Sequence, residues 1–340
     1  MTPARFAEIT DRYSSLRLAL VGDFCLDRYL EIDPAKAETS IETGLPVHNV
    51  VRVRSQPGAA GTILNNLCAL GAGTIWPVGF CGDDGEGFEL HRALAAMPGV
   101  RLEHFQRTPL RRTFTYCKPL MMHPGQAPQE QSRLDSKNWE PTPALLAGEI
   151  WNSISDLRFK VDGVAVMDQV DIPDTGVVTS RILPLLGSFP HGNPGTPVVA
   201  DSRRGLRGWP SVTFKMNLAE LSTLTGLAQD ASLTQIGEAA RALAEQNGRE
   251  VFVTLSERGI LGAAPSGEVE HVPCLPLRGP IDIVGAGDSV TANLTVALAA
   301  GATLREAIEL ANAAASVVIH QLGTTGTASV PQIRGLLLQG

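Results

Sequence analysis

The residues with the clearest chemical potential lie at 282–290, DIVGAGDSV, directly ahead of a long helix-forming stretch. Gly285, Ala286 and Gly287 stand where that helix would begin, so their free N–H groups and the positive end of the helix dipole would face one point. Asp288 would lie beside that point. Its carboxylate either completes an ordinary helix start, or takes a proton from an attacking hydroxyl while the amides stabilise a transferring phosphoryl group.

The segment matches neither of two better-known glycine fingerprints. In the dinucleotide pattern G-x-G-x-x-G, the third glycine position is occupied by Val290, whose side chain would crowd the helix against its strand. The Gly-Lys-Ser/Thr ending of the P-loop is also absent. The pattern therefore argues against an NAD-linked reductase and leaves both interpretations of Asp288 open.

The elements that would position these residues follow from hydrophobic patterning. Continuous apolar runs predict buried parallel strands at 16–24, 74–80, 161–168, 197–202 and 250–256. Amphipathic stretches predict helices at 60–72, 86–97, 142–154, 234–248, 286–300 and 303–321. This alternation predicts an α/β fold, with a mostly parallel sheet and helices on both faces, as a single domain over 1–340.

Two stretches, 28–56 and 100–122, contain strand-like segments with no helix between them. Their alternation of apolar and polar residues favours an antiparallel sheet with one face in solvent. We expect this small β-sheet to form a lid over the strand ends, where α/β folds bind ligands, although a surface hairpin without a role would show the same pattern. Exposed strands of this kind also favour a homodimer through the lid.

Composition narrows the class of protein. The net charge of −7 comes without a basic cluster, which argues against nucleic acid as a partner. The chain has no apolar run of about twenty residues and no signal pattern at its start, so no membrane segment is expected. The five cysteines form no C-x-x-C pair, which indicates reduced thiols in a cytoplasmic protein, and the seven histidines show no metal-ligand spacing.

Five motifs, in order and at matching spacing, resemble those of the ribokinase-like (phosphofructokinase-B) family of carbohydrate and nucleoside kinases. DIVGAGD (282–288) is similar to the signature D-T-x-G-A-G-D, and GDFCLD (22–27) to G-D-x-x-x-D. PGAAGTILNNLCALGA (57–72) resembles the sugar-side signature P-G-G-A-A-N-V-A-x-N-x-A-x-L-G-A. NLAE (217–220) matches N-x-x-E, and TLSERG (254–259) resembles T-L-G-x-x-G. The opening GDFCLDRY is most similar to the heptose-phosphate kinase branch.

The resemblance implies a ribokinase-like kinase that transfers the γ-phosphate of ATP to a hydroxyl of a sugar or sugar phosphate. Asp288 would be the base, and the amides of Gly285, Ala286 and Gly287 would form the anion hole. Mg²⁺ would bridge the phosphates, and a monovalent cation such as K⁺ is a further expectation. A catalytically weak or inactive sugar- or nucleotide-binding regulator on the same fold is the alternative.

The resemblance also implies two sets of binding residues. The expected nucleotide site consists of Asn217, Glu220, Thr254, Ser256, Gly259, Asn312 and Gly323. Glu220 would act on magnesium through water, although an ordinary helix cap would also explain Asn217 and Glu220. The expected sugar site consists of Asp27, Gly58, Ala59 and Thr62, joined by Asp168 because it ends a predicted strand. Three arginines, Arg112, Arg203 and Arg204, could meet a phosphate on the sugar or be solvated surface charges.

Four positions depart from the family pattern. Ile283 replaces a threonine and Ser256 a glycine, which leaves the chemistry of Asp288 intact. Ala59 replaces a glycine and Thr62 an asparagine on the sugar side. A methyl group narrows the space beside a ligand, and threonine reaches less far than asparagine, so we expect an altered sugar pocket.

Overall fold

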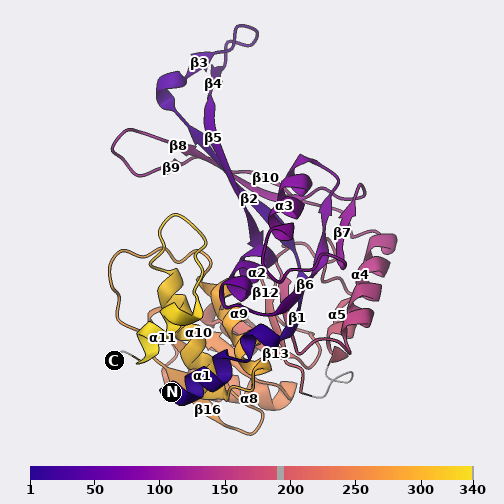
Figure 1. Cartoon of the computed structure of the whole chain (residues 1–340), viewed down its shortest axis with the longest axis vertical. Coiled ribbons are helices and arrows are strands. Elements are labelled where there is room, and N and C mark those ends of the chain that lie inside the picture. Colours follow the sequence, from indigo (N-terminus) through magenta and orange to yellow (C-terminus); the bar gives the residue numbers. More distant parts are fainter. Residues whose placement is uncertain (190–194, 339–340) are drawn as a thin grey trace.

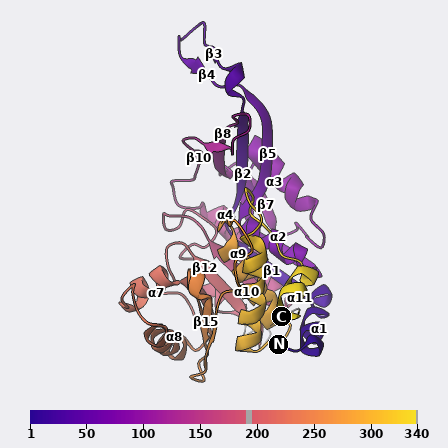
Figure 2. The same cartoon turned by 90° about the vertical axis from the view of Figure 1, so that its left-hand side faces the viewer.

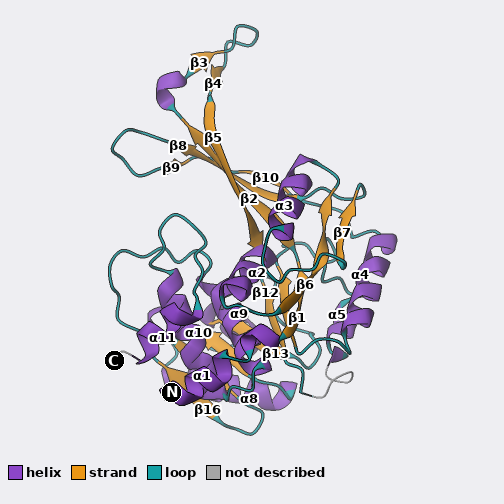
Figure 3. Cartoon of the chain, viewed as in Figure 1, coloured by secondary structure: helices purple, strands orange, loops and turns teal. Residues whose placement is uncertain are grey.

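The computed structural model describes residues 1–189 and 195–338. Its main sheet contains β1 (Arg17–Gly22), β6 (Thr74–Gly82), β7 (Phe105–Thr108), β11 (Gly163–Asp168), β12 (Val198–Ser202), β13 (Thr213–Asn217), β14 (Val251–Thr254), β15 (Ile260–Ala263) and β16 (Val269–Val272). The strand order is β16-β15-β14-β13-β12-β11-β1-β6-β7 (Figures 1 and 3). All neighbouring pairs are parallel except β14–β15 and β15–β16. The carboxyl ends of the parallel strands therefore meet at one edge.

Helices cover both faces of this sheet. They are α1 (Pro3–Thr10), α2 (Ala60–Ala69), α3 (Gly85–Ala95), α4 (Ala144–Leu157), α5 (Leu183–Leu186), α7 (Leu218–Thr225), α8 (Leu233–Asn247), α9 (Ala286–Ala299), α10 (Leu304–Val318) and α11 (Val330–Leu338). Side chains of α1, α2, α3, α9, α10 and α11 pack in one core cluster, and those of α4, α5, α7 and α8 in the other. The predicted α/β fold with helices on both faces is confirmed.

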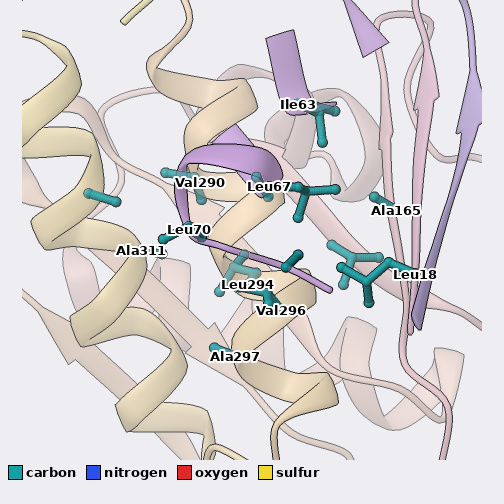
Figure 4. Packing of buried hydrophobic residues seen from close by; sticks show 14 of the residues in the cluster. Leu18, Ile63, Leu67, Leu70, Ala165, Val290, Leu294, Val296, Ala297 and Ala311 are labelled. Atoms are coloured by element: carbon teal, nitrogen blue, oxygen red, sulfur yellow. The ribbon is translucent and has the colours of Figure 1, made fainter. Parts of the chain in front are cut away.

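The apolar side chains of β1 contribute to both core clusters. Leu18 and Leu20 belong to one cluster and Ala19 and Val21 to the other, because successive side chains of a strand point to opposite faces. Within the first cluster, Val290 and Leu294 of α9 lie close to Leu67 of α2 and to Leu70, which caps the end of α2 (Figure 4). Helix α9 is therefore anchored between the sheet and α2, which fixes the position of its first turn.

A second sheet rises above this body (Figure 2). It consists of β2 (Phe24–Ile32), β5 (Val50–Ala59), β8 (Phe114–Met121), β9 (Gln129–Glu130) and β10 (Leu134–Ser136), and a small hairpin of β3 (Glu38–Thr39) and β4 (Pro46–Val47) extends beyond it. The order is β10-β8-β2-β5, with β9 paired to β8. We call this sheet, together with the hairpin, the lid.

Two details of the predicted lid need correction. The lid is mixed rather than antiparallel, because β8 runs parallel to β2. In the predicted segment 100–122, only β8 belongs to the lid, since Phe105–Thr108 pairs with β6 in the main sheet. Alternation within one strand reveals which side is buried but carries no information about the partner strand or its direction.

The register of the lid decides which side chains face the body. Asp27 lies opposite Gln56 of β5 and Tyr116 of β8, and residues directly opposite each other share a face. The next residue, Arg28, points to the other face, where its guanidinium lies 2.6 Å from Glu89 of α3. Helix α3 therefore covers one face of the lid, and Asp27, Gln56 and Tyr116 belong to the opposite face.

Two further features concern the chain as a whole. Within residues 1–189 and 195–338, no helix combines the length and apolar character needed to cross a membrane. The cysteines are free thiols, as predicted; Cys25 and Cys81 are buried and Cys274 is exposed.

Candidate functional site

The GAG segment opens α9 through a left-handed glycine. Gly285 is the N-cap, with φ 82° and ψ −2°, a conformation that favours glycine. Gly287 and Asp288 lie in the first turn, where backbone N–H groups have no partner within the helix. The predicted anion hole needs one correction, because the amide of Ala286 donates to the carbonyl of Ile283 at 3.2 Å. The turn that sets the helix entry uses this donor.

Asp288 titrates in an unusual range. Burial and the negative charge of Asp201 raise the pKa of Asp288 from 3.8 to about 7; Lys215 opposes this shift and Asp27 adds to it. The influence of Asp27 shows that the predicted sugar-binding acid lies near the predicted base. A carboxyl with a pKa near neutrality is well matched to general-base work at that pH.

Lys215 is a functional candidate that the sequence analysis missed. Its ammonium is buried and lies 2.6 Å from the carboxylate of Asp201, which also accepts from the Thr291 hydroxyl at 3.1 Å. The same ammonium lies 3.1 Å from the point where a Cβ on Gly287 would stand. A buried cation therefore backs the first turn of α9, and glycine at 287 leaves room for it. A lysine inside an apolar strand was the available signal, since burying it requires a partner.

Asn217 and Glu220 form the helix cap that was one of their two interpretations. The Asn217 side chain accepts from the Glu220 amide at 2.9 Å, and the Glu220 carboxylate accepts from the Asn217 amide at 2.8 Å. Burial raises the pKa of Glu220, and the charge of Asp201 adds to this. One oxygen of Glu220 takes the cap bond and the other is left for a further partner, so capping does not exclude a metal role.

A cavity of about 670 Å³ adjoins this helix start. It is lined by four predicted nucleotide residues, Thr254, Ser256, Gly259 and Asn312. Ala286 and Gly287 also line it, and its walls are mainly apolar, from Ile260, Leu275, Leu277, Ile281, Val290, Ala315 and Ile319. The residues of the loop after β16 were missed, because only the tertiary structure folds that loop over α9 and α10.

Three of the predicted nucleotide residues, Asn312, Gly323 and Gly259, have a structural role in the backbone around the cavity. The Asn312 side chain donates to the carbonyl of Pro273 at 2.7 Å and so holds the loop that covers the cavity. Gly323 does not line the cavity; its amide donates to the Asp282 carboxylate at 3.1 Å. A Cβ on Gly259 would lie 2.1 Å from the carbonyl of Val272, so this position requires glycine.

At two of the departures from the family pattern, the backbone has a conformation typical of the glycine that is replaced. Ala59 and Ser256 stand at family glycine positions, and both have φ of 52°. For Ala59, ψ is −118°, a combination that side chains with a Cβ rarely adopt. The fold therefore imposes these conformations on non-glycine residues beside the site.

The sugar side is built around Asp27. A Cβ on Gly58 would lie 2.6 Å from the Asp27 carboxylate, so glycine at 58 makes room for that side chain. Burial raises the pKa of Asp27, and the positive charges of Lys118 and Arg133 oppose the shift. These two lid cations were not recognised in the sequence, because no local pattern relates them to Asp27.

Two predicted sugar ligands need correction. Thr62 is 1% exposed and packs inside the first turn of α2. Asp168 is 0% exposed; its carboxylate accepts from Ser202 at 2.6 Å and from Arg204 at 2.9 Å. Neither side chain is open to a ligand in this structure, and Asp168 instead positions Arg204.

The three arginines differ in their surroundings. Arg204 is held by Asp168 at the carboxyl edge of the sheet. Arg203 is largely exposed, with Asp171 at 3.4 Å. Arg112 lines a separate cavity of about 360 Å³ beside Asp84. Among them, Arg204 has the fixed orientation that a phosphate ligand requires.

Asp23 ties the strand edge together. Its buried carboxylate accepts from the amides of Gln169 at 2.8 Å, Val170 at 3.3 Å and Val177 at 2.7 Å. Burial and the charge of Asp168 raise the pKa of Asp23, and the three amide donors oppose this shift. The loop after β11, which carries the surroundings of Arg204, therefore depends on this acid.

The acids at the helix start suit a divalent cation. Among the described residues, no three His, Cys, Asp or Glu side chains gather closely enough to bind a metal ion by themselves. Asp201 nevertheless raises the pKa of both Glu220 and Asp288, so these carboxylates share one electronegative region. Mg²⁺ usually binds to one or two carboxylates, with waters and substrate phosphates completing its shell, and this donor set fits that arrangement.

Comparisons with known proteins agree with this geometry. The model of the "pfkB family carbohydrate kinase" matches residues 207–331. The "Bifunctional protein HldE" of Azorhizobium caulinodans is 30% identical over 311 residues, covering 90% of this chain and 61% of that protein. The protein of the same name from Gluconacetobacter diazotrophicus is 31% identical over 327 residues, covering 94% and 63%. The chain thus spans about three fifths of the length of these relatives.

Solved structures share the fold. Arabidopsis thaliana ribokinase, complexed with ribose and ATP, superposes with a TM-score of 0.64 at 22% identity, over 93% of this chain and 95% of that one. Escherichia coli phosphofructokinase-2 in complex with fructose-6-phosphate has a TM-score of 0.71 at 18% identity, over 94% and 98%. The same enzyme in complex with potassium has a TM-score of 0.70, again at 18% identity over 94% and 98%.

Proposed function

The chain carries a pfkB-family carbohydrate kinase domain on a ribokinase-like fold, and from this premise we propose that it is an ATP-dependent sugar kinase. It would transfer the γ-phosphate of ATP to a hydroxyl of a sugar or sugar phosphate. The observation that carries the proposal is the environment of Asp288. Its pKa is raised to about 7, it lies in the first turn of a helix beside a cavity of nucleotide size, and the negative charge of Asp27 contributes to the raised pKa.

In the proposed reaction, Asp288 takes the proton of the sugar hydroxyl, whose oxygen attacks the γ-phosphorus while the bond to ADP breaks. The amides of Gly285, Gly287 and Asp288 and the cation of Lys215 stabilise the charge of the transferring group. General-base action of this kind contributes about 10²–10⁴ in rate. Mg²⁺, when bound, would neutralise and bridge the phosphates, and Glu220 would hold it through water.

The cavity supports ATP as the donor. Its apolar walls, which include Ile260 and Ile319, suit the faces of an adenine ring, and the cavity reaches Gly287, where the phosphates would lie. We also propose activation by a monovalent cation such as K⁺, which the potassium complex of phosphofructokinase-2 supports. Rates measured in K⁺ and in Na⁺ at equal ionic strength test this.

For the acceptor, we propose a sugar phosphate rather than a free sugar. The positive charges of Lys118 and Arg133, both in the lid, lower the pKa of Asp27. Arg204 is held in place by Asp168 at the edge of the main sheet. Arg133 already pairs with Asp135 and Arg204 with Asp168, and the remaining donors of these guanidinium groups, together with the Lys118 ammonium, suit a ligand that brings its own negative charge. The fructose-6-phosphate complex of phosphofructokinase-2 supports the same class.

The test is ATP consumption with Mg²⁺ across pentoses, hexoses, heptoses, their monophosphates and nucleosides, with the phosphorylated product identified. The variant Asp288→Asn should lose about 10²–10⁴ of kcat, because its amide cannot accept the proton. An Asp288→Asn protein as fast as the parent would remove Asp288 as the base. Ligand binding without phosphorylation across the panel would favour the regulator instead.

A further inference from the structure

Gln56 joins the lid to the loop that follows α10. Its side-chain amide donates to the Thr325 hydroxyl at 2.8 Å, and the Thr324 hydroxyl donates to its carbonyl oxygen at 3.5 Å. Thr325 is buried and Gln56 is half-buried, so this contact is partly shielded from water. The partners are 269 residues apart in sequence and connect the first lid hairpin with the C-terminal part of the chain.

The same loop forms one wall of the anion hole. The point where a Cβ on Gly285 would stand is 3.3 Å from Cβ of Thr325, so Thr325 packs directly on the N-cap of α9. Two residues earlier, the Gly323 amide donates to Asp282 at 3.1 Å. The other oxygen of Asp282 accepts from the amide of Val284 at 3.1 Å. The position of the loop therefore sets the position of the backbone that leads into the helix.

The loop is braced as a unit. The Gln321 side chain donates to the carbonyl of Thr327 at 2.7 Å and accepts from its amide at 3.2 Å. Asn66 of α2 donates to the carbonyl of Gly326 at 3.4 Å. A displacement of Thr325 would consequently be passed on along the loop and would not be absorbed at one residue.

Gln56, the lid residue of this contact, lies on the face of the lid that carries Asp27. Gln56 is the register partner of Asp27 on the neighbouring strand, so both side chains belong to the face opposite α3. A ligand held by Asp27 therefore fixes the strand pair that carries Gln56. Through Thr325, the contact reaches Gly285 without using any residue that lines the cavity beside α9.

We propose that Gln56 is a positioning residue that couples the seating of the lid on the sugar to the alignment of the anion hole. When the lid is seated, the bond to Thr325 holds the loop against Gly285 and keeps the amides of Gly287 and Asp288 aimed at the transferring phosphoryl group. This inference rests on the proposed kinase function for its consequence in catalysis. Its structural part, the dependence of 282–288 on Gln56, does not.

The variants are Gln56→Leu, which removes both bonds, and Thr325→Val, which removes the hydroxyl and keeps the packing on Gly285. Ser55→Ala is the matched control on the same strand, because Ser55 points to the other face and binds Glu89 at 2.7 Å. The first measurement is amide hydrogen exchange of the full chain with saturating Mg·AMP-PNP. Both variants should exchange about 2- to 10-fold faster at 282–288 than the parent, the range expected for one hydrogen bond, and Ser55→Ala should match the parent.

The second measurement is steady-state kinetics with Mg·ATP and the acceptor of the sugar panel that turns over fastest. Each variant should lower kcat by about 2- to 10-fold with both KM values within about twofold of the parent. The double variant should be no slower than either single one, because the two side chains act through one contact.

The outcomes separate the two proposals. Unchanged exchange at 282–288 in both variants overturns the coupling, whatever the enzyme's activity. A raised acceptor KM for Gln56→Leu with normal kinetics for Thr325→Val also overturns it, and makes Gln56 a sugar ligand. Faster exchange in both variants, from a parent that phosphorylates nothing in the panel, supports the coupling while the kinase function fails.

Discussion

At the scale of single residues, Asp288 lies where burial disfavours the negative charge of its carboxylate. The proposed reaction nevertheless needs that charge, because only the carboxylate can accept a proton. Burial and Asp201 raise the pKa of Asp288 to about 7, and Lys215 keeps it from rising further. The proposed base works only when deprotonated. Its environment therefore sets both the pH dependence of the reaction and part of the stability of the fold.

The first prediction concerns the pH profile. Because Asp288 must be ionised in the free enzyme, kcat/KM should fall about tenfold per pH unit below about pH 7 and level off above it. Initial rates between about pH 5.5 and 8.5 in buffers of constant ionic strength check this. A profile that stays flat through pH 6 would mean that another group, or none, takes the proton.

The second prediction concerns stability. The pKa of Asp288 is higher in the folded state than its ordinary 3.8, so the folded protein binds the proton more tightly. The stability associated with this group is present below about pH 4 and is lost as the pH rises through about 7. Asp288→Asn, which cannot ionise, should raise the melting temperature at pH 8 and change it little at pH 4.5. Thermal unfolding at both pH values tests the sign; a melting temperature lowered at pH 8 would contradict it.

Several residues of the candidate site were recognisable in the sequence, and others were not. Asp27, Gly58, Gly285, Gly287 and Asp288 carry their signal locally, since a glycine-rich helix start and an acid after a strand are visible in a few letters. Lys215 and Gln56 carry none, because what distinguishes them is a contact with a residue 14 or 269 positions away. Thr62 and Asp168 were predicted as sugar ligands from a motif and from a strand end, but both side chains are buried in this structure, and burial is not visible in the local sequence.

At the scale of elements, the join between the lid and α2 contains strain. Ala59 ends β5 and caps α2 with φ 52° and ψ −118°. A residue with a Cβ in such a sparsely populated region costs about 1–3 kcal/mol, whereas glycine adopts it freely at an entropic cost of about 0.5–1 kcal/mol. The departure at 59 is thus a backbone matter as well as a change in the sugar pocket.

The third prediction follows from that strain. Ala59→Gly should increase the free energy of unfolding by about 1 kcal/mol, because relief of strain exceeds the entropy of glycine. Urea denaturation measures it. Ala144→Gly, at the ordinary exposed first position of α4, is the matched control and should destabilise by about 0.5–1 kcal/mol. Equal losses for both variants would show that the conformation at 59 stores no strain.

The pattern of elements was mostly readable from the sequence. Each predicted strand and helix corresponds to one in the structure, because apolar runs and 3.6-residue periodicity depend on neighbouring residues. The pairing of β7 with β6 and the parallel run of β8 beside β2 were not predicted from the sequence. The strand β13, which leads into the N-x-x-E motif, was not predicted either. Strand pairing joins segments whose own letters do not name the partner.

At the scale of the whole molecule, the far end of the lid stands in solvent with apolar side chains. Ile41, Val51 and Val53 are exposed, the last two by 50% and 48%. Figures 1 and 2 show this end, with the β3–β4 hairpin at its tip, extending well beyond the body. Apolar strand surface of this kind favours pairing with another chain. We propose that two copies associate through their lids.

The fourth prediction tests that association. Sedimentation velocity at micromolar concentration should show a dimer for the parent and a monomer for the double variant Val51→Lys, Val53→Lys, because charges on the strand face oppose pairing. The exposed pair Leu145→Lys, Phe159→Lys, placed on and beside α4, is the control and should remain dimeric. A parent that sediments only as a monomer would remove the proposal.

What the sequence by itself determined is local. It specified which segments become strands and helices, where a helix would present free amides beside an acid, and at which positions the backbone requires glycine. The tertiary structure alone decided that Lys215 lies against Gly287, that Asp168 turns inward to Arg204, and that Gln56 meets Thr325. The physical reason is that charge, burial and hydrogen bonding at a site depend on the distances between segments. Those distances are set by strand order and register, which no single segment encodes.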